Sequence, residues 1–284
     1  MSRQLRDQIG RFGVWRGAWQ TTADIAVHLE HFGYGTLWLG GSPDGQLDLA
    51  DELLGVTGRL TVGTSIVNIW KDDAATVARS FERLSQRHDG RFVLGIGAGH
   101  REATQEYVKP YEALAAYVDR LLELQVPADR LMLAALGPKV LALARDRSGG
   151  ALPYLITPEH TRQAREILGP VPVLAPEHKV VIDTDRERAL QLGRRRVRNP
   201  YLGLVNYTSN LSRLGFADDD LAGDGSDRLI DALVAHGSAQ QVAGQVSAHF
   251  AAGADHVAVQ LLTETDTDPV PGYGELANAL GLVA

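Results

Sequence analysis

The stretch Thr61-Val62-Gly63-Thr64-Ser65-Ile66-Val67-Asn68 decides how this chain is expected to fold. It begins as an apolar strand, passes through the small residues Gly63-Thr64-Ser65, and resumes its apolar run at Ile66. A glycine inside a strand usually marks a bulge, or a place where a ligand or another backbone approaches closely. Because a helical pattern begins at about Asp73, we predict a barrel strand whose far end is shaped to hold something flat.

Length and composition are those of an ordinary globular protein. The chain has 284 residues, of which 44% are hydrophobic and 22% charged, and this length fits one α/β barrel domain. No apolar run approaches the ~18 residues of a membrane helix, and the first eight residues carry no apolar signal region. The chain contains no cysteine, which excludes disulfides, thiolate metal sites and a cysteine nucleophile.

The formal charge of -7 disfavours a broad nucleic-acid-binding surface. We therefore expect a soluble, cytoplasmic protein that binds a small-molecule substrate, with neither nucleic acid nor membrane as a partner. The sequence contains no HExxH or similar metal-binding spacing, so no metal site is predicted. A GxSxG nucleophile motif and a Walker A motif are also absent.

Apolar strand-like segments alternate with amphipathic helical patterns along the whole chain. The expected strands are residues 12–15, 36–39, 60–66, 92–96, 131–134, 152–156, 179–182 and 256–262. The expected helices are residues 22–31, 47–57, 74–87, 111–124, 138–145, 158–168, 186–197 and 239–251. Buried strands with helices between them indicate a parallel sheet. Eight such repeats favour a single closed (β/α)8 TIM barrel over an open, doubly wound sheet.

One connection is longer than the others. Residues 199–237 separate the seventh helical unit from the last strand–helix pair, and we interpret them as an insertion within one domain that spans residues 1–284. The insertion contains Tyr201, Asn206-Tyr207-Thr208 and the acidic run Asp218-Asp219-Asp220. Insertions of this size are often lids or binding segments, and the sequence leaves open whether this one closes over a site.

The glycine cluster Gly95-Ile96-Gly97-Ala98-Gly99 ends the fourth expected strand. It is not a dinucleotide-binding fingerprint, because its sixth position is His100 and because it follows the fourth expected strand rather than the first. It predicts tight packing inside the barrel, close approach of the backbone to a ring or phosphate, or both. His100 stands at the strand end, where an imidazole can donate or accept a proton, and is the candidate catalytic residue.

Two later strand-to-helix turns are candidate anion sites. Gly137-Pro138-Lys139 opens a helix with proline in its first turn, where free N–H groups, the helix dipole and Lys139 favour an anion. Thr157-Pro158-Glu159 repeats this design, with Thr157 as the expected N-cap. Both segments can equally be ordinary helix starts. Two adjacent helix N-termini late in a barrel are nevertheless a common setting for a phosphate.

Aromatic and basic side chains leave further alternatives open. Trp15, Trp19, Trp38 and Trp70 either form an apolar wall for a substrate or flavin ring, or fill the core beneath the loops. The run Arg194-Arg195-Arg196-Val197-Arg198 is interpreted as a solvated helix face, with an anionic cofactor tail as the alternative. Together these patterns predict a barrel that binds a flat, phosphorylated cofactor and relies on that cofactor for its chemistry.

Several segments, taken in their order and spacing, resemble the luciferase-like monooxygenase superfamily. They are Gly63-Thr64-Ser65-Ile66, Gly90-Arg91-Phe92-Val93-Leu94-Gly95-Ile96-Gly97-Ala98-Gly99, Ala134-Ala135-Leu136-Gly137-Pro138-Lys139, Asn206-Tyr207-Thr208, Leu214-Gly215-Phe216 and Ala252-Gly253-Ala254-Asp255-His256-Val257. The resemblance covers essentially the whole chain and is greatest to probable oxidoreductases that use the deazaflavin coenzyme F420. It implies a luciferase-like barrel with an insertion before the last strand, a homodimer, and hydride transfer between F420 and a small organic substrate. The alternatives are an FMN-dependent monooxygenase that uses reduced flavin and oxygen, and a non-catalytic flavin- or deazaflavin-binding protein.

The resemblance also implies where the cofactor binds. A non-prolyl cis peptide bond between Ser65 and Ile66 would support the central ring of the flavin or deazaflavin, and the phosphate site would fall at Gly137, Pro138 and Thr157. The predicted cofactor-binding residues are Thr64, Ser65, Ile66, Gly97, Ala98, Gly99, Ala135, Gly137, Pro138, Lys139 and Thr157.

The chain departs from the pattern of the F420-dependent sugar-phosphate and alcohol dehydrogenases of this family. Those enzymes carry an Asp-His pair after the second strand, where this sequence has Gly40-Gly41, and an acidic residue where it has His100. Their proton-transfer scheme and their substrates are therefore not carried over. The hypothesis is that His100 replaces the missing acid or base.

Overall fold

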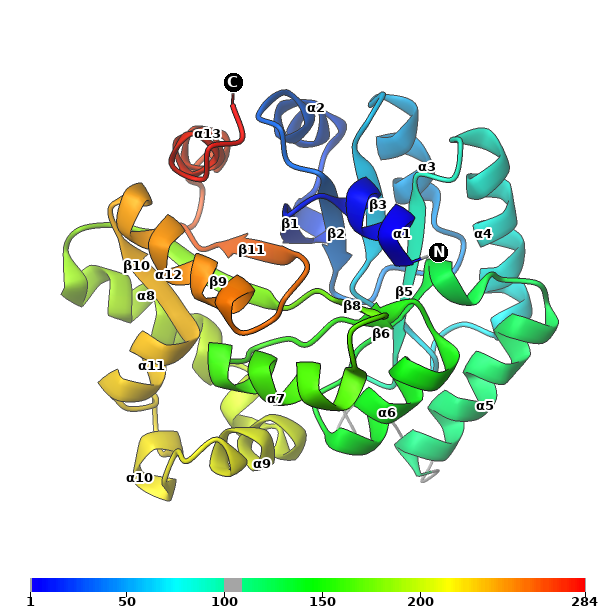
Figure 1. Cartoon of the computed structure of the whole chain (residues 1–284). Helices are drawn as coiled ribbons and strands as arrows, with labels where there is room; N and C mark the ends of the chain where they lie inside the picture. Colours follow the sequence, from blue (N-terminus) through cyan, green and yellow to red (C-terminus); the bar gives the residue numbers. More distant parts are fainter. Residues whose placement is uncertain (1, 100–108, 284) are drawn as a thin grey trace.

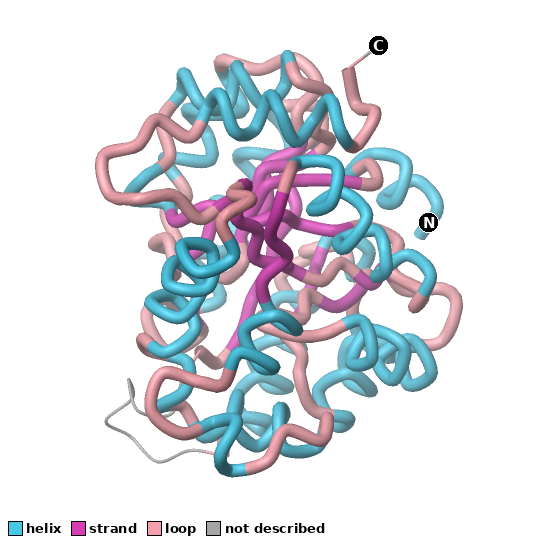
Figure 2. The backbone as a smooth tube through the Cα atoms, turned by 90° about the vertical axis from the view of Figure 1, so that its left-hand side faces the viewer, coloured by secondary structure: helices cyan, strands magenta, loops and turns pink. Residues whose placement is uncertain are grey.

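One parallel sheet of short, buried strands lies at the centre of the molecule, with helices around it (Figures 1 and 2). The computed structural model describes residues 2–99 and 109–283. The strands are β1 Phe12–Gly17, β2 Thr36–Gly40, β3 Thr61–Thr64, β4 Val67–Asn68, β5 Phe92–Gly97, β6 Leu131–Leu133, β7 Gly150–Ala151, β8 Val173–Leu174, β9 Glu177–Ile182, β10 Val234–Gly237 and β11 Val257–Leu261. Their pairing order is β10-β9-β11-β1-β2-β3-β5-β6-β7-β8, with β4 on β5.

The strand pairing closes into a barrel. β8 pairs with β7, whereas β9, which follows β8 after two residues, pairs with β11. The backbone N–H groups of Ala175 and Glu177 continue the β7 edge by donating to the carbonyls of Ala151 and Pro153. If β3–β4 and β8–β9 are each taken as one broken strand, the described strands form the predicted ring of eight, and β10 adds to β9 outside it.

Helices surround the barrel, and most of them pack on the outer faces of its strands. They are α1 Ser2–Ile9, α2 Ala23–His31, α3 Asp48–Gly55, α4 Ala74–Arg87, α5 Pro110–Glu123, α6 Pro138–Arg147, α7 Pro158–Leu168, α8 Arg186–Arg198, α9 Val205–Arg213, α10 Asp218–Leu221, α11 Asp227–Leu233, α12 Ala239–Ala251 and α13 Val270–Ala279. Polar N-caps explain why α4, α7 and α12 begin where the sequence predicts. The carboxylate of Asp73, the Thr157 hydroxyl and the Ser238 hydroxyl accept backbone N–H groups of the first turn.

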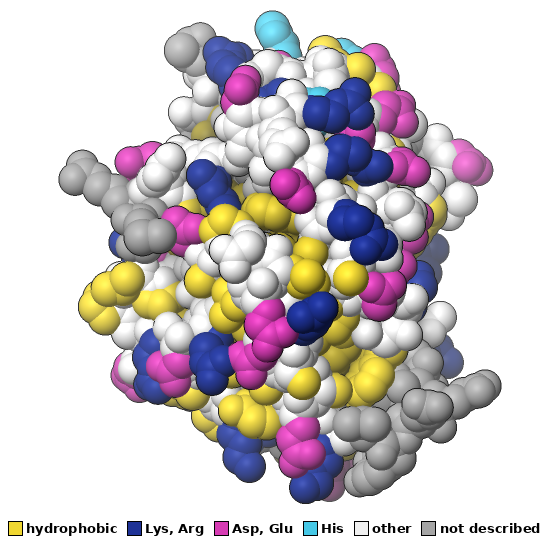
Figure 3. Space-filling view, turned by 90° about the vertical axis from the view of Figure 1, so that its right-hand side faces the viewer, with side chains coloured by type: hydrophobic (Ala, Val, Ile, Leu, Met, Phe, Trp, Pro, Cys, Tyr) yellow, Lys and Arg dark blue, Asp and Glu magenta, His cyan; other side chains and the backbone are white. Residues whose placement is uncertain are grey.

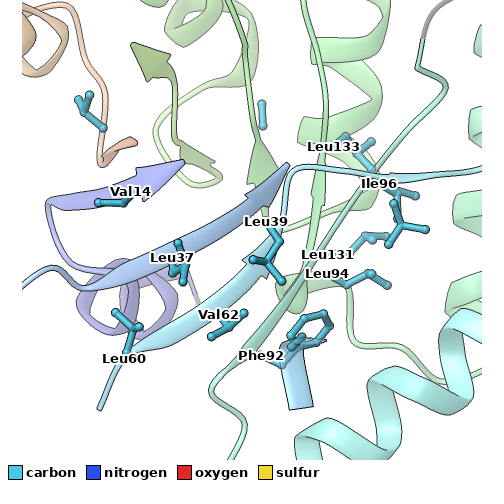
Figure 4. Close-up of a cluster of buried hydrophobic side chains, with 14 of the residues drawn as sticks. Val14, Leu37, Leu39, Leu60, Val62, Phe92, Leu94, Ile96, Leu131 and Leu133 are labelled. Atoms are coloured by element: carbon cyan, nitrogen blue, oxygen red, sulfur yellow. The ribbon is translucent and has the colours of Figure 1, made fainter. Parts of the chain in front are cut away.

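Alternate residues of each strand face two different cores. Phe92 and Leu94 point outward and pack with residues of the covering helices, as Figure 4 shows for a set of buried side chains from several strands. Val93 belongs to the cluster inside the barrel, with Trp15, Trp38, Met132 and Val173 among its members. This period of two is the geometry of a pleated strand, and it makes near-continuous apolar strands necessary.

The sixth strand is the one strand that the sequence analysis misplaced. We expected residues 152–156, but the strand observed is β7, Gly150–Ala151. Pro153 has no N–H to donate to a ladder, and Leu155 adopts a left-handed conformation with φ 55°. Leu152 still donates its N–H to the Leu133 carbonyl at 2.8 Å, and the Pro153 carbonyl still accepts from Glu177 at 2.9 Å. The chain therefore leaves the sheet after Pro153, and this brings Tyr154 to the carboxyl end of the barrel.

The insertion at residues 199–237 is folded rather than irregular. It contains α9, α10 and α11, which gather beside α8 at the lower left of Figure 1, and it ends in β10. The sequence analysis did not predict these elements, nor the terminal helices α1 and α13.

On the face over α4 and α5, Figure 3 shows hydrophobic side chains among charged side chains of both signs. The homodimer stays a prediction.

A buried histidine, directly before the last strand, bonds to the second strand and to the turn before the first strand. The indole N–H of Trp38 can only donate, so it fixes His256 Nε2, 2.9 Å away, as an acceptor. His256 Nδ1 therefore carries the proton and donates to the carbonyl of Gly10 at 2.8 Å. Burial favours the neutral ring and lowers the pKa of His256 from 6.5 to about 4.

Acid is expected to destabilise the protein through His256. Because the folded-state pKa lies below the unfolded value, the stabilisation is complete above about pH 6.5 and is lost as the pH falls towards 4. His256→Gln keeps an acceptor for Trp38 and a donor for Gly10 but does not titrate. Between pH 7 and pH 5, wild type should lose about 2 kcal/mol more unfolding free energy than this variant, measured by urea denaturation. The exposed His31→Gln should keep the wild-type pH dependence, and equal losses in wild type and His256→Gln would contradict the assignment.

Candidate active site

A cavity of about 510 Å³ lies at the carboxyl ends of the barrel strands. Its described wall takes residues from or just beyond β1, β2, β3, β5, β6 and β7, and from α8 and the insertion. In a parallel barrel these strand ends point to one face, so side chains distant in sequence converge there. This face is therefore the candidate active site.

Main chain forms one wall of the cavity. The Ser65–Ile66 peptide bond is cis, as the family resemblance implies. The Ser65 N–H donates to the Leu39 carbonyl at 2.7 Å, and the indole of Trp15 donates to the Ser65 carbonyl at 3.3 Å. Ala98 and Gly99 continue this wall beside Ser65 and Ile66. Apart from Ile66, this wall is therefore made of small residues.

The glycine cluster of β5 serves packing at one end and the cavity at the other. A Cβ at Gly95 would lie 1.9 Å from the Thr64 carbonyl oxygen, and one at Gly97 would lie 2.9 Å from Ala134 Cβ. Gly99, with φ 60°, lines the cavity, and a Cβ there would meet the Asn68 side-chain amide at 2.7 Å. Tight packing is thus shown for Gly95 and Gly97, while close approach to a ligand remains open for Gly99.

Two indoles fill the space beside Gly40-Gly41. A Cβ on Gly40 would lie 1.9 Å from the Trp15 ring, and a Cβ on Gly41 would lie 1.9 Å from the Trp19 ring. Both tryptophans line the cavity, whereas Trp38 is buried in the barrel and Trp70 donates its indole N–H to the Ala98 carbonyl at 2.7 Å. A larger residue at position 40 would therefore collide with the buried Trp15 ring, whereas the exposed Trp19 ring can move away from position 41.

Three tyrosines form the wall nearest the insertion. Tyr154 packs against Trp15 with ring centroids 5.2 Å apart and donates its phenol to Gln260 Oε1 at 2.9 Å. The Tyr201 phenol donates to the Tyr154 oxygen at 2.8 Å, and Tyr207 packs edge-on against Tyr201 at 5.0 Å. Burial raises the pKa of Tyr154, which keeps this phenol neutral. These contacts connect the insertion to the barrel interior.

A buried ion pair lies behind the tyrosines. Lys179 is fully buried, and its Nζ lies 3.1 Å from Glu177 Oε1 and 4.0 Å from the centroid of the Tyr154 ring. Glu177 also accepts the Leu155 backbone N–H at 3.1 Å. Burial lowers the pKa of Lys179 to about 8, although the Glu177 carboxylate opposes the shift. The sequence analysis missed this pair; its signal was two opposite charges two residues apart at the start of a buried strand.

Arg196 is the second functional candidate that the sequence analysis did not single out. It lies in the last turn of α8 and lines the cavity together with Tyr154, Tyr201 and Tyr207. The run that contains it was interpreted as a solvated helix face. The structure contradicts that interpretation for Arg196, because α8 packs beside the insertion and this one position faces the cavity.

The predicted cofactor-binding residues fall into two groups. Those that line the cavity are Ser65, Ile66, Ala98, Gly99 and Ala135. Those that do not line it are Thr64, Gly97, Gly137, Pro138, Lys139 and Thr157. Their binding roles stay predictions. His100, the predicted catalytic residue, lies outside the described residues.

The residues outside the lining have identifiable positions. The Thr64 hydroxyl donates to the Gly95 carbonyl at 2.7 Å and accepts the Gly95 N–H at 2.9 Å, so it joins two strands. Gly137 and Thr157 are the N-caps of α6 and α7. These two helix starts adjoin each other, because His160 Nε2 of α7 lies 2.9 Å from the Leu136 carbonyl. Leu136 itself lines the cavity, so the predicted phosphate site flanks the cavity wall.

Within residues 2–99 and 109–283, no group of three or more histidine or acidic residues is placed to hold a metal ion. In the same ranges, no helix combines the length and the apolar character needed to cross a membrane.

Comparison with known proteins finds a match to a family and to solved structures. The model of a family described as luciferase-like monooxygenase matches residues 6–256. No curated protein sequence matches the chain. An F420-dependent secondary alcohol dehydrogenase, solved with an F420-acetone adduct, is 14% identical at a TM-score of 0.76, with 96% of this chain and 99% of that chain covered.

Two further structures are similar. The coenzyme F420-dependent tetrahydromethanopterin reductase from Methanopyrus kandleri is 14% identical at a TM-score of 0.67, with 96% of each chain covered. The oxygenating constituent of 3,6-diketocamphane monooxygenase from Pseudomonas putida, solved with FMN, is 18% identical at a TM-score of 0.65, with 96% and 98% covered. Identities this low show a shared fold.

Proposed function

Because the chain belongs to the luciferase-like monooxygenase family, we propose that it is an oxidoreductase that transfers hydride between coenzyme F420 and a small organic substrate. The observation that carries the proposal is the cavity at the strand ends, with the main chain of Ser65 and Ile66 on one wall and tyrosines on another. The preference for F420 rests on the resemblance of the sequence segments quoted above. Similar folds have been solved with F420 and with FMN, so both cofactors have a precedent.

The residues of the cavity fit a flat, conjugated ring. The lining is mainly apolar and aromatic, and apart from Ile66 the wall at Ser65-Ile66 and Ala98-Gly99 is made of small residues. A deazaflavin or flavin bound there would supply the hydride-transfer chemistry. In this proposal Ser65 and Ile66 support the ring, and the adjoining starts of α6 and α7 hold the cofactor's phosphate through backbone N–H groups and Lys139.

The chain's own side chains would position the reactants and exclude water. Trp15 is fixed by its bond to the Ser65 carbonyl, so it holds the edge of the proposed ring site in place. Trp19 is 65% exposed at the rim of the cavity and would cover a bound ring. His100 remains the proposed acid or base, since Gly40-Gly41 offers no titratable group.

The second candidate is an FMN-dependent monooxygenase. The specific observation in its favour is that Trp15 and Trp19 pack over Gly40-Gly41. Known F420-dependent dehydrogenases carry an Asp-His pair at these positions. A non-catalytic carrier is the third reading, and the same packing is compatible with it. Oxygen consumption with reduced FMN and a long-chain aldehyde would support the monooxygenase. Tight binding without turnover over a broad substrate panel would support the carrier.

Titration of the purified protein with F420 and with FMN tests the cofactor assignment directly. F420 is expected to bind at least tenfold more tightly than FMN and to quench tryptophan fluorescence, because Trp15 and Trp19 line the cavity. Trp19→Ala should weaken binding by roughly three- to tenfold, the size of a typical aromatic contact. The control Val171→Ala removes an exposed residue outside the cavity lining and should change nothing. Tighter binding of FMN would favour the second candidate, and no binding of either cofactor would contradict the proposal.

A further inference from the structure

Arg196 differs from its neighbours in the basic run at the end of α8. The other arginines of the run pair with acidic side chains: Arg194 with Asp227, Arg195 with Glu264, and Arg198 with Asp224. Arg196 makes no such pair with any described residue and instead lines the cavity. The three paired arginines are explained as surface ion pairs, whereas the position of Arg196 at the cavity is not.

The position of Arg196 follows from the packing of α8. Gly193 and Val197 are buried on the face of α8 that packs on α11 and β10, and Arg196 stands next to this face. After the helix the chain turns at Pro200, so that Tyr201 comes back to the cavity beside Arg196. The guanidinium is thus held between a packed helix and the tyrosine wall.

The charge of Arg196 is unbalanced inside the cavity. It is the one charged side chain among the described lining residues, and its Nε atom is buried without a hydrogen-bond partner. The nearby Lys179 is already neutralised by Glu177. A partly desolvated cation with an unused donor is unfavourable unless an anion binds it. In a chain with a formal charge of -7, this local positive charge is a specific feature.

We propose that Arg196 binds a carboxylate of the substrate, which makes the substrate class a small organic anion with an apolar or aromatic body. The carboxylate would lie against Arg196 at the tyrosine wall, and the reacting carbon would face the wall at Ser65-Ile66. This inference rests on the proposed function, because it orients the substrate against the proposed cofactor ring. The cofactor also carries anionic groups, but the helix starts of α6 and α7 provide a separate place for its phosphate.

Isothermal titration of the full chain with benzoate and with its neutral analogue benzamide tests this subsite. Benzoate should bind wild type at least tenfold more tightly than benzamide. Arg196→Gln should weaken benzoate roughly thirtyfold, the range of a lost charge-assisted bidentate bond, and leave benzamide unchanged. Arg196→Lys should recover part of the affinity, since it restores the charge without the planar fork. The matched control Arg195→Gln removes a surface arginine of the same run and should bind benzoate like wild type.

Two further measurements distinguish a substrate carboxylate from the cofactor's anionic groups, and the proposed anion subsite from the proposed function. Arg196→Gln should change the Kd of F420 and of FMN by less than threefold. A rise of tenfold or more in either Kd with benzoate binding intact would mean that Arg196 holds the cofactor, and would overturn the inference. Equal affinity of wild type for benzoate and benzamide, or of wild type and Arg196→Gln for benzoate, would also overturn it. Charge-dependent benzoate binding in a protein that binds neither cofactor would support the subsite while rejecting the proposed function. Unchanged melting temperatures of the Arg196 variants are required for each comparison.

Discussion

Gly95→Ala is expected to lower the free energy of unfolding by more than about 4 kcal/mol, enough to leave most of the chain unfolded or insoluble. The new Cβ would lie 1.9 Å from the Thr64 carbonyl oxygen and 2.8 Å from Leu152 Cδ1. Backbone on one side and barrel core on the other leave it no room. The strands cannot separate without breaking the two hydrogen bonds between Thr64 and Gly95. Urea denaturation followed by circular dichroism measures the effect.

The matched control is Gly244→Ala in α12. A Cβ there meets no heavy atom within 4 Å, and alanine is the better helix former. This variant should gain about 0.5–1 kcal/mol of stability. A loss below about 1 kcal/mol for Gly95→Ala would show that the strands yield, and the close-packing account of the glycine cluster would be wrong.

Lys179→Met is expected to cost about 3–5 kcal/mol of unfolding free energy, because it leaves the Glu177 carboxylate buried without its cation. Lys179 is fully buried, and no other described cation lies within ion-pair distance of Glu177. The variant also removes the ammonium over the Tyr154 ring. The unfolding free energies of wild type, Lys179→Met, Glu177→Gln and the double variant, measured by chemical denaturation, form a double-mutant cycle.

The double variant Glu177→Gln with Lys179→Met distinguishes a lost charge pair from lost packing. It removes both charges and should recover most of the stability, because no charge is then buried without its partner and the glutamine oxygen can still accept the Leu155 N–H. Arg195→Met, which breaks the exposed pair with Glu264, should cost less than about 1 kcal/mol. A double variant no more stable than Lys179→Met would show that packing against the tyrosines, not charge, dominates at this position.

Local patterns were sufficient to predict most of the barrel. Capping residues such as Asp73 and Ser238 act within a few residues of the chain, so α4 and α12 begin where the sequence places them. The sixth strand failed because hydrophobicity alone cannot distinguish a ladder from a buried irregular segment, and Pro153 should have weighed against the strand. The helices of the insertion were missed because their apolar faces pack on α8 and on one another.

The candidate site was predicted in part for the same physical reasons. The small-residue break at Gly63-Thr64-Ser65 marked this strand end, and the family resemblance implied the cis Ser65–Ile66 bond. Ser65 and Ile66 line the cavity, and their role in cofactor binding stays a prediction. Arg196 was not identified because four arginines in one helix look alike in sequence, and tertiary packing alone decides which of them faces inward. Lys179 was missed because the expected strand began at residue 179, so its ion pair with Glu177 was not considered.

The packing of Trp15 and Trp19 over Gly40-Gly41 has a consequence for protein engineering. Grafting the Asp-His pair of related dehydrogenases onto positions 40 and 41 would drive each new side chain into an indole. The graft therefore requires a smaller residue at position 15 in the same step, and the loss of Trp15 would also free the Ser65 carbonyl. A side chain at position 40 thus depends on a smaller residue at position 15, because Trp15 is buried, whereas the exposed Trp19 can move aside for a side chain at position 41.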